Sequence, residues 1–477
     1  MEFTLDSRIV RIGAALASGA LIYLSERPDA EWWAGFLAPI PLLAAAFRAS
    51  WQETAGLSAL AALLGFVPQI RHLTRFVGTD GTALILALQV VQWLLVVQRT
   101  RSVVERSRHW LIVFAYPALC AAIDTLAAAL SPHGTAGSLA YSQMKILPVI
   151  QIAALAGTPG IVFLVSLFGS LVAVAGRRRL DIERPILAYG LPAAVLTAGL
   201  GLGIVRLDQA EAGKTIPVGL VAIDRASPAS LLHQPQAGGT AWLQYAAAIA
   251  HLAAAGAKLI VLPEEIAAFD DGDLDSVRAR LGALARDGNV HLLAGLRVLA
   301  RDHMENRAWL FAPDGALIAD YAKRHPVPGL ESGISPGRDD AVAMIGAEKF
   351  GIAICRDMDF PVLGRSYAAR GVAAMLVPAW DAGYYDWSHA APAVLRGVEG
   401  GYTVIRTARD GLISVSDRYG RVLAAEATVD APVASLEYPA PLSDTSTPYA
   451  QFGGWFGWLC VAASVAMLLP VRHRRHR

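Results

Sequence analysis

Long apolar runs follow one another through the first two hundred residues, and they constrain the fold more than any other feature of the chain. Each run is close to the roughly 20 apolar residues that cross a bilayer core. Pro39, Pro41 and Pro68 interrupt the second and third runs, so one of these could be re-entrant or packed inside a bundle. The sequence therefore predicts a polytopic α-helical membrane domain with about seven helices. The runs cover approximately residues 10–26, 32–48, 54–70, 82–98, 109–131, 147–175 and 185–205.

The overall composition agrees with a membrane protein and excludes some functions. The 477 residues have a mean hydropathy of +0.43 and only 17% are charged, which is too apolar for a wholly soluble chain. A formal charge of +1, with no basic stripe interleaved with aromatic residues, argues against nucleic-acid binding. Three cysteines cannot form a full disulfide framework. Cys120 and Cys460 lie in apolar runs, whereas Cys355 lies in the polar middle of the chain.

The distribution of arginines between the runs predicts an orientation. Arginines concentrate in alternate loops, at Arg48, at residues 99–108 and at residues 177–184. By the positive-inside rule these loops and the N-terminus are cytoplasmic, with Arg71 and Arg75 as a modest exception. We expect no cleaved signal peptide, because residues 10–26 lack a small-residue cleavage site and further spans follow at once. A last apolar run, Trp455–Pro470, returns the chain to the cytoplasm and leaves the basic tail Arg472–Arg477 there, which makes eight crossings.

The chain then divides into three parts. Residues 1–206 form the membrane bundle, residues 207–448 form a domain outside the cytoplasm, and residues 449–477 form the last helix and its tail. In the middle part short β-like runs such as Ile216–Ile223 and Thr403–Thr407 alternate with helical stretches such as Trp242–Ala255. This alternation predicts an α/β domain of two sheets faced by helices, long enough to have its own core.

Three reactive side chains close strand-like runs of this middle part. Glu264 ends Leu259–Glu264, Lys323 ends Ile318–Lys323, and Cys355 ends Gly351–Cys355. Side chains at strand ends can converge at one rim of a sheet, where a carboxylate, an ammonium and a thiol could act as general base, cationic stabiliser and nucleophile. Taken singly, each has a structural explanation: a packed cysteine, a solvated acidic turn and a surface lysine.

The combination is more specific than its members. The pattern Leu262-Pro263-Glu264, Tyr321 to His325 with Pro328 and Glu331, and Ile352 to Cys355 resembles the nitrilase superfamily and its Glu-Lys-Cys triad. In a membrane context it resembles the apolipoprotein N-acyltransferase family over nearly the whole chain, including Gln151 to Ala153 with Gly157 and Gly160, and Leu395 to Gly401 with Arg406 and Gly411.

The resemblance implies an αββα domain on the periplasmic side of a bacterial inner membrane. It implies that Cys355 takes an acyl chain as a thioester, that Glu264 is the general base, that Lys323 stabilises the oxyanion, and that Glu331 orients the lysine. The implied reaction moves a fatty acyl chain from a phospholipid to the N-terminal amine of a diacylglyceryl lipoprotein. We expect a monomer surrounded by membrane lipids.

One departure from the family pattern keeps other functions open. Arg356 and Asp357 follow the cysteine where the family has Tyr and Glu. A permanent positive charge there is expected to lower the pKa of the thiol and to affect which substrates fit. The alternatives are a membrane-bound amidase of the same superfamily and a non-catalytic scaffold. The aromatic segment Trp380–Trp387 is either a lid or an interfacial belt. Because the sequence has no metal-ligand cluster, Walker-type loop or dinucleotide fingerprint, we expect no metal and no cofactor.

Overall fold

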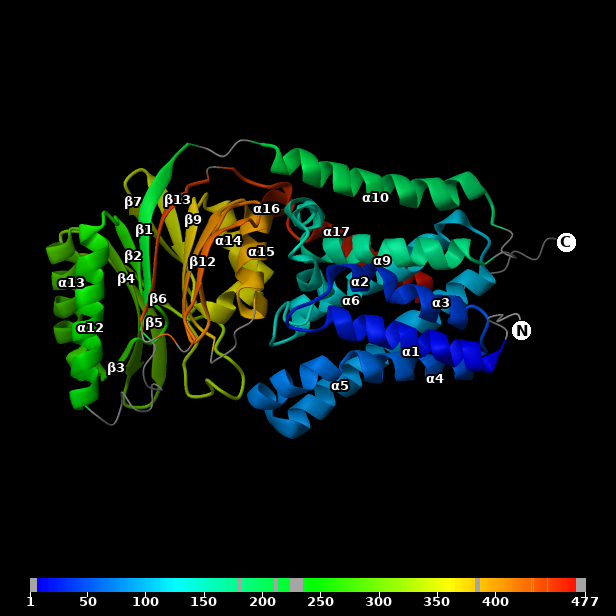
Figure 1. Ribbon diagram of the computed structural model, residues 1–477, viewed down its shortest axis with the longest axis horizontal. Helices are drawn as coiled ribbons and strands as arrows, with labels where there is room; N and C mark the ends of the chain where they lie inside the picture. The colour runs from blue at the N-terminus through cyan, green and yellow to red at the C-terminus, as the bar shows by residue number, and fades with distance from the viewer. Residues whose placement is uncertain are drawn as a thin grey trace. The chain divides into compact units, whose positions relative to one another are not determined.

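A computed structural model describes residues 7–177, 182–209, 213–223, 235–381, 387–429, 431, 433–443 and 445–468. The chain divides into two compact units (Figure 1). One comprises Met1–Asp208 and Phe452–Arg477, and the other comprises Gln209–Gln451. The basic residues Arg178, Arg179 and Arg472–Arg477, which the predicted orientation uses, lie outside the described residues.

The first unit is helical. Its core brings together residues from α1, α3, α4, α5, α6, α9 and α10, and α17 returns to pack against α6 although it is far away in the sequence. Phe163 and Phe456 meet edge to face there, with ring centroids 5.1 Å apart. The helices are α1 (Arg8–Ser25), α2 (Trp32–Leu37), α3 (Pro39–Ala46), α4 (Trp51–Gly65), α5 (Val67–Arg106), η1 (Trp110–Phe114), α6 (Ala115–Leu130), η2 (Leu139–Gln143), α7 (Leu147–Ile150), α8 (Ala153–Ala156), α9 (Thr158–Ala175), α10 (Pro185–Leu207) and α17 (Trp455–Leu468).

Apolar helices confirm the predicted membrane character. Five helical segments among the described residues are long and apolar enough to cross a membrane: Arg8–Ser25, Val77–Arg106, Trp110–Leu130, Thr158–Ala175 and Pro185–Leu207. Shorter apolar helical segments cover Trp32–Ala46, Leu147–Ala156 and Trp455–Met467. On α5 the exposed residues Leu84, Leu88, Val91 and Leu95 recur at helical spacing and form an outward apolar stripe.

One predicted span and one predicted loop differ from the structure, in both cases near a glycine. The run 147–175 is not one helix: α7 ends at Ile150, α8 ends before Gly157 (φ 69°, ψ −171°), and α9 begins at Thr158 with Pro159 in its first turn. The predicted loop with Arg71 and Arg75 is instead helical and belongs to α5, which kinks at Gly78 (φ 70°, ψ −178°). Both glycines adopt a backbone conformation that is essentially closed to other residues, so a helix can break there without a loop.

The second unit contains two mixed β-sheets. One has the order β13-β1-β2-β4-β5-β6 with β3 paired to β4, and the other has the order β12-β11-β10-β9-β8-β7. The first sheet consists of β1 (Thr215–Ala222), β2 (Leu259–Val261), β3 (Ala267–Asp270), β4 (His291–Leu299), β5 (Met304–Phe311), β6 (Leu317–Ala322) and β13 (Ala434–Pro441). The second consists of β7 (Ala341–Ile345), β8 (Glu348–Ile352), β9 (Ala374–Trp380), β10 (Thr403–Arg409), β11 (Leu412–Ser416) and β12 (Val422–Ala427).

Three apolar clusters show that this unit has four layers. A central cluster joins the inner faces of the two sheets, for example Leu220 and Leu310 with Ile352 and Ile405. One outer cluster lies under α12 and α13, and the other lies under α14 and α15 (Figure 1). The predicted αββα architecture is therefore confirmed. The helices are α12 (Pro235–Ala254), η3 (Asp271–Asp273), α13 (Leu274–Gly288), η4 (Cys355–Asp359), α14 (Pro361–Ala369), η5 (Trp387–His389), α15 (Ala391–Gly400) and α16 (Pro448–Phe452).

Candidate active site

Glu264 follows the buried strand β2, and its turn is held on both sides. Its backbone N–H donates to the Ala379 carbonyl at 3.3 Å, which links the two sheets. A side chain at Gly295 would place a Cβ 2.6 Å from the Cα of Glu264, so only glycine permits this approach. The next residue, Glu265, has φ 51° and binds the Arg297 guanidinium through both carboxylate oxygens at 2.8 and 2.5 Å. A backbone hydrogen bond, a close approach to Gly295 and the ion pair of Glu265 thus fix the turn that carries Glu264.

Lys323 lies directly after β6 and is buried, with an exposed side-chain fraction of 1%. Its ammonium donates to Glu264 Oε1 at 2.8 Å and to Glu331 Oε1 at 2.9 Å. Its backbone is fixed as well, because its N–H donates to the Asn306 carbonyl and its carbonyl accepts from Gly337, both at 2.8 Å. A buried ammonium is tolerable here because two carboxylates partner it.

Asn306, on β5, is a site residue that the sequence analysis missed. Its side chain is fully buried, and its Nδ2 donates to Glu264 Oε1 at 2.7 Å and to Glu331 Oε1 at 3.3 Å. Glu331 is fixed further by the backbone N–H of Val327, 2.6 Å from its Oε2. An amide in the run Met304–Phe311, whose later residues are apolar, is the only sequence signal for Asn306.

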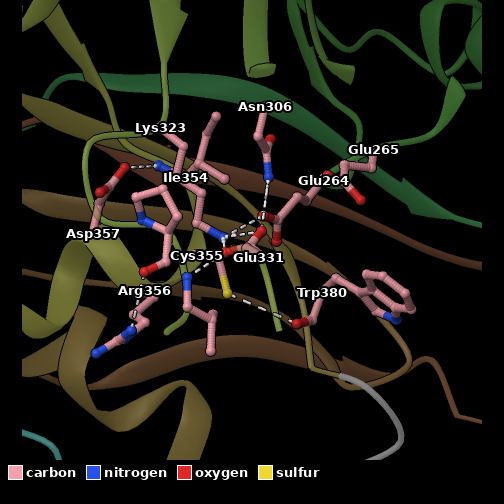
Figure 2. Close-up of polar contacts among 12 residues, drawn as sticks. Glu264, Glu265, Asn306, Lys323, Glu331, Ile354, Cys355, Arg356, Asp357 and Trp380 are labelled. Carbon is pink, nitrogen blue, oxygen red and sulfur yellow. Dashed lines mark hydrogen bonds and ion pairs between the residues drawn. The ribbon is translucent and has the colours of Figure 1, made fainter. Parts of the chain in front are cut away.

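Cys355 lies in the turn between β8 and α14, with φ 48° in the left-handed region. The short helix η4 begins at the cysteine itself, and α14 begins at Pro361 as the sequence predicts. The thiol donates to the Trp380 carbonyl with a sulfur–oxygen distance of 3.8 Å. Figure 2 shows Glu264, Lys323 and Glu331 turned towards one another next to the sulfur.

Asp357 ties this turn to the loop after Lys323. Its fully buried carboxylate accepts from the Tyr321 hydroxyl at 2.7 Å, from the backbone N–H groups of His325 (2.8 Å) and Arg324 (3.2 Å), and from the Ile354 N–H at 3.1 Å. The Nδ1 of the His325 ring lies 2.9 Å from Asp357 Oδ1. A carboxylate with this many donors fixes two segments that are more than thirty residues apart.

Burial dominates the electrostatics of the three predicted residues. It raises the pKa of Glu264 to about 7, although the Lys323 ammonium opposes the shift. Burial also raises the pKa of the Cys355 thiol, an effect that Glu264 increases and Lys323 reduces. Burial alone would lower the pKa of Lys323, but Glu264 and Glu331 outweigh it and the net shift is upward. At neutral pH the resting site therefore holds an ammonium, a protonated thiol and a carboxyl group that titrates.

The pKa of Cys355 lies above its ordinary value, because burial outweighs the lowering effect of the cations Lys323 and Arg406. The Arg356 guanidinium extends away from the sulfur in Figure 2. It donates to the Pro326 carbonyl at 3.3 Å, lies 3.7 Å from an Asp359 oxygen, and lies 5.7 Å from the ring centroid of Phe360.

The structure thus brings Glu264, Lys323, Glu331 and Cys355 together at one place. Within the part of the chain that the structure describes, no group of three or more His, Cys, Asp or Glu side chains could hold a metal ion. Of the aromatic segment Trp380–Trp387, residues 382–386 lie outside the described residues.

Comparisons with known proteins cover both units. The family model "Apolipoprotein N-acyltransferase N-terminal domain" matches residues 18–171, and the family model "Carbon-nitrogen hydrolase" matches residues 230–425. An apolipoprotein N-acyltransferase of Geobacter metallireducens is 27% identical over 372 residues, which are 71% of this chain and 70% of that protein. The chain belongs to the apolipoprotein N-acyltransferase family.

Other similarities within this family and its superfamily are shorter. An apolipoprotein N-acyltransferase of Brucella melitensis is 31% identical over 146 residues, covering 28% of this chain and 26% of that protein. A hydrolase of Schizosaccharomyces pombe is 32% identical over 167 residues, covering 30% and 51%. A crystal structure of an amidase from Nesterenkonia sp. aligns with 50% of this chain and 94% of its own, at 23% identity and a TM-score of 0.41.

Proposed function

We propose that this chain is an N-acyltransferase that moves a fatty acyl group from a phospholipid to the N-terminal amine of a diacylglyceryl lipoprotein, through a thioester on Cys355. The observation that supports it most directly is the union, in one chain, of the N-acyltransferase N-terminal match with a carbon-nitrogen hydrolase match. The second match includes a buried carboxylate and ammonium and a half-buried cysteine. Both substrates are held in a bilayer, which is where apolar helices would retain the enzyme.

In the first half of the reaction Glu264 removes the Sγ proton of Cys355. The thiolate attacks the ester carbonyl carbon, a C–S bond forms, and the Lys323 ammonium stabilises the oxyanion. The ester C–O bond then breaks, and the leaving lysophospholipid alcohol takes the proton from Glu264. A carboxyl group with a pKa of about 7 suits both the removal and the return of this proton near neutral pH.

In the second half the neutral α-amine attacks the thioester carbonyl carbon. A C–N bond forms, the C–S bond breaks, Glu264 takes the surplus amine proton and returns it to the sulfur. Glu331 keeps the Lys323 ammonium aimed at the oxyanion through its 2.9 Å contact. Each turnover thus restores the thiol and needs no cofactor. The enzyme works as a monomer in the bacterial inner membrane, with the catalytic unit on the periplasmic side.

Intact-protein mass spectrometry tests this function. The full chain in detergent is incubated with a phosphatidylethanolamine of defined acyl chains, and the wild type should gain one acyl mass that Cys355→Ala does not gain. Addition of a synthetic diacylated lipopeptide should remove that mass and produce N-acylated peptide. Release of free fatty acid without N-acylated peptide would support the amidase-like hydrolase instead. A wild type that never gains the acyl mass would contradict the thioester.

A further inference from the structure

Arg409, the last residue of β10, is a buried cation between two parts of the site. Arg409 is only 4% exposed, and its Nη1 donates to the Glu265 carbonyl at 3.1 Å. Its guanidinium carbon lies 4.7 Å from the ring centroid of Trp380, within the range of a cation–π contact. A guanidinium can make both contacts at once, because it is planar, permanently charged and able to stack on an aromatic ring while it donates hydrogen bonds.

Trp380 carries the acceptor of the thiol. It is the last residue of β9 and pairs with Arg409 in the parallel register of β9 and β10. Its carbonyl accepts from Cys355, and its indole Nε1 donates to Asp410 Oδ2 at 2.7 Å. The N–H of Asp381 donates to the Arg409 carbonyl at 3.0 Å, so the strand ends are joined through backbone and side chains.

Besides Trp380, Arg409 contacts the turn that carries Glu264. Glu265 has φ 51°, a conformation that costs a non-glycine residue energy and persists only when its surroundings hold it. Arg297 holds its carboxylate, and Arg409 holds its carbonyl. One guanidinium therefore contacts both the turn of the general base and the residue whose carbonyl accepts from the nucleophile.

We propose that Arg409 is a positioning residue, which fixes the Glu264 turn relative to the Trp380 carbonyl and so holds the Cys355 sulfur within reach of its base. This role rests on the proposed function, in which Cys355 is the nucleophile and Glu264 the general base. Arg409 contacts the Glu265 carbonyl and the Trp380 ring and no reacting atom among the described contacts, so we expect it to affect the rate of thiol chemistry and to leave donor binding unchanged.

The test compares Arg409→Met, Arg409→Lys and a matched control. The full chain in detergent is mixed with phosphatidylethanolamine at several mole fractions, and single-turnover acylation of Cys355 is followed by mass spectrometry. Arg409→Met should lower the maximal acylation rate about tenfold, as expected for a small displacement of reacting groups, with an unchanged half-saturating mole fraction. Arg409→Lys keeps a cation at the ring and should recover part of the rate, which purely structural damage would not allow.

Arg418 supplies the control, because its guanidinium carbon also lies 4.7 Å from an aromatic centroid, that of Tyr419. Arg418→Met should leave the rate within about twofold of wild type, since among the described residues Arg418 donates hydrogen bonds to Tyr419 and Thr445 and to neither Glu265 nor Trp380. An unchanged maximal rate in Arg409→Met, an equal loss in Arg418→Met, or a change in half-saturation alone would each overturn the proposal.

Iodoacetamide separates this proposal from the proposed function. Alkylation of Cys355 needs no lipid, and it should slow in Arg409→Met and partly recover in Arg409→Lys. If wild type is never acylated while alkylation follows this order, the acyltransferase function fails and the positioning role stands. If wild type is acylated and the variants alkylate as fast as wild type, the positioning role fails alone. If Arg409→Met does not fold, Arg409→Lys decides, with wild-type rates counting against the proposal.

Discussion

The protonation states of Glu264 and Cys355 set the chemistry of the site at the scale of single residues. Burial raises the pKa of both groups, so the thiol rests protonated and the carboxyl group titrates at about 7. Lys323 keeps its proton, because the two carboxylates raise its pKa despite burial. In the proposed mechanism the ionised carboxylate of Glu264 takes the thiol proton, so we expect the reaction rate to follow the ionisation of Glu264.

The acylation rate of Cys355 should accordingly rise with pH through about 7 and level off above it. The rate rises with pH because Glu264 is the proposed base. Its protonated carboxyl group, which cannot take a proton, predominates below this pKa, and its ionised form predominates above it. Glu264→Gln should lower the rate by roughly 100-fold or more and abolish this limb of the profile. A pH series of single-turnover acylation measures both effects. The same limb in Glu264→Gln would show that another group is the base.

The residues of the site differ in how far the sequence predicts them. Glu264, Lys323 and Cys355 each end an apolar strand-like run, and a resemblance to a known motif groups them. Asn306 could not be found in this way, because it lies inside β5 and its role arises from a contact with Glu264, 42 residues away. The position of Arg356 next to Cys355 in the sequence does not give the direction of its side chain, and burial, not a neighbouring charge, dominates the pKa of the thiol.

At the scale of elements, the turn from β8 to α14 depends on Asp357. This carboxylate gathers donors from β6, from the following loop and from the turn of Cys355 itself. Left-handed φ at Cys355 is unfavourable for a residue with a Cβ, so the hydrogen bonds of Asp357 hold Cys355 in its strained position.

Asp357→Asn should therefore lower both stability and thiol reactivity. The amide replaces one acceptor by a donor that faces other donors, at a cost of about 1–3 kcal/mol. The measurement is the thermal unfolding midpoint together with the iodoacetamide rate of Cys355. Asp417→Asn is the control, since Asp417 is also a buried turn carboxylate and accepts from Tyr419 N–H at 2.9 Å and Arg421 N–H at 2.8 Å. It should lower the midpoint and leave the Cys355 rate unchanged, and equal losses of rate would contradict the role of Asp357.

Element boundaries show what the sequence cannot supply. The strands β1 and β10 match the predicted runs Ile216–Ile223 and Thr403–Thr407 closely, whereas no predicted run covers β12 or β13. β12 is largely exposed and its apolar residues are followed at once by Glu426, whereas β13 is an edge strand in which exposed residues alternate with less exposed ones up to Ala440. In the helical unit hydropathy alone cannot see the break at Gly157, because both sides of it are apolar.

The backbone conformation of Gly157 should not tolerate a side chain. Its φ of 69° and ψ of −171° belong to a region essentially restricted to glycine, and Gly157→Ala should cost about 1–3 kcal/mol. The thermal unfolding midpoint of the full chain in detergent measures the loss. Gly190→Ala, inside α10 and with no atom within 4 Å of the added Cβ, should leave the midpoint unchanged or slightly higher. An unaffected Gly157→Ala would mean that α8 and α9 can join into one helix.

At the scale of the whole molecule, the side of the membrane on which residues 207–448 lie depends on whether an odd or an even number of helices crosses the membrane before them. Seven crossings before this segment put it opposite the N-terminus, and six would return it to the same side. Only five segments among the described residues are long enough to cross by length and composition, so the parity depends on the shorter segments such as Trp32–Ala46 and on α4 with its 15 residues. A single short helix that fails to cross would move the catalytic unit into the cytoplasm.

Cysteine labelling from outside decides between these arrangements. In a background with Cys120, Cys355 and Cys460 replaced by Ala, one cysteine is introduced at the exposed Asp314 or at the exposed Arg48. In intact spheroplasts a membrane-impermeant maleimide should label Asp314→Cys, whereas Arg48→Cys should react only after permeabilisation, because the positive-inside rule puts its loop in the cytoplasm. Protection of Asp314→Cys in intact spheroplasts would place the catalytic unit inside. An odd number of the short segments would then fail to cross, and the lipoprotein amine would have to be reached from the cytoplasmic leaflet.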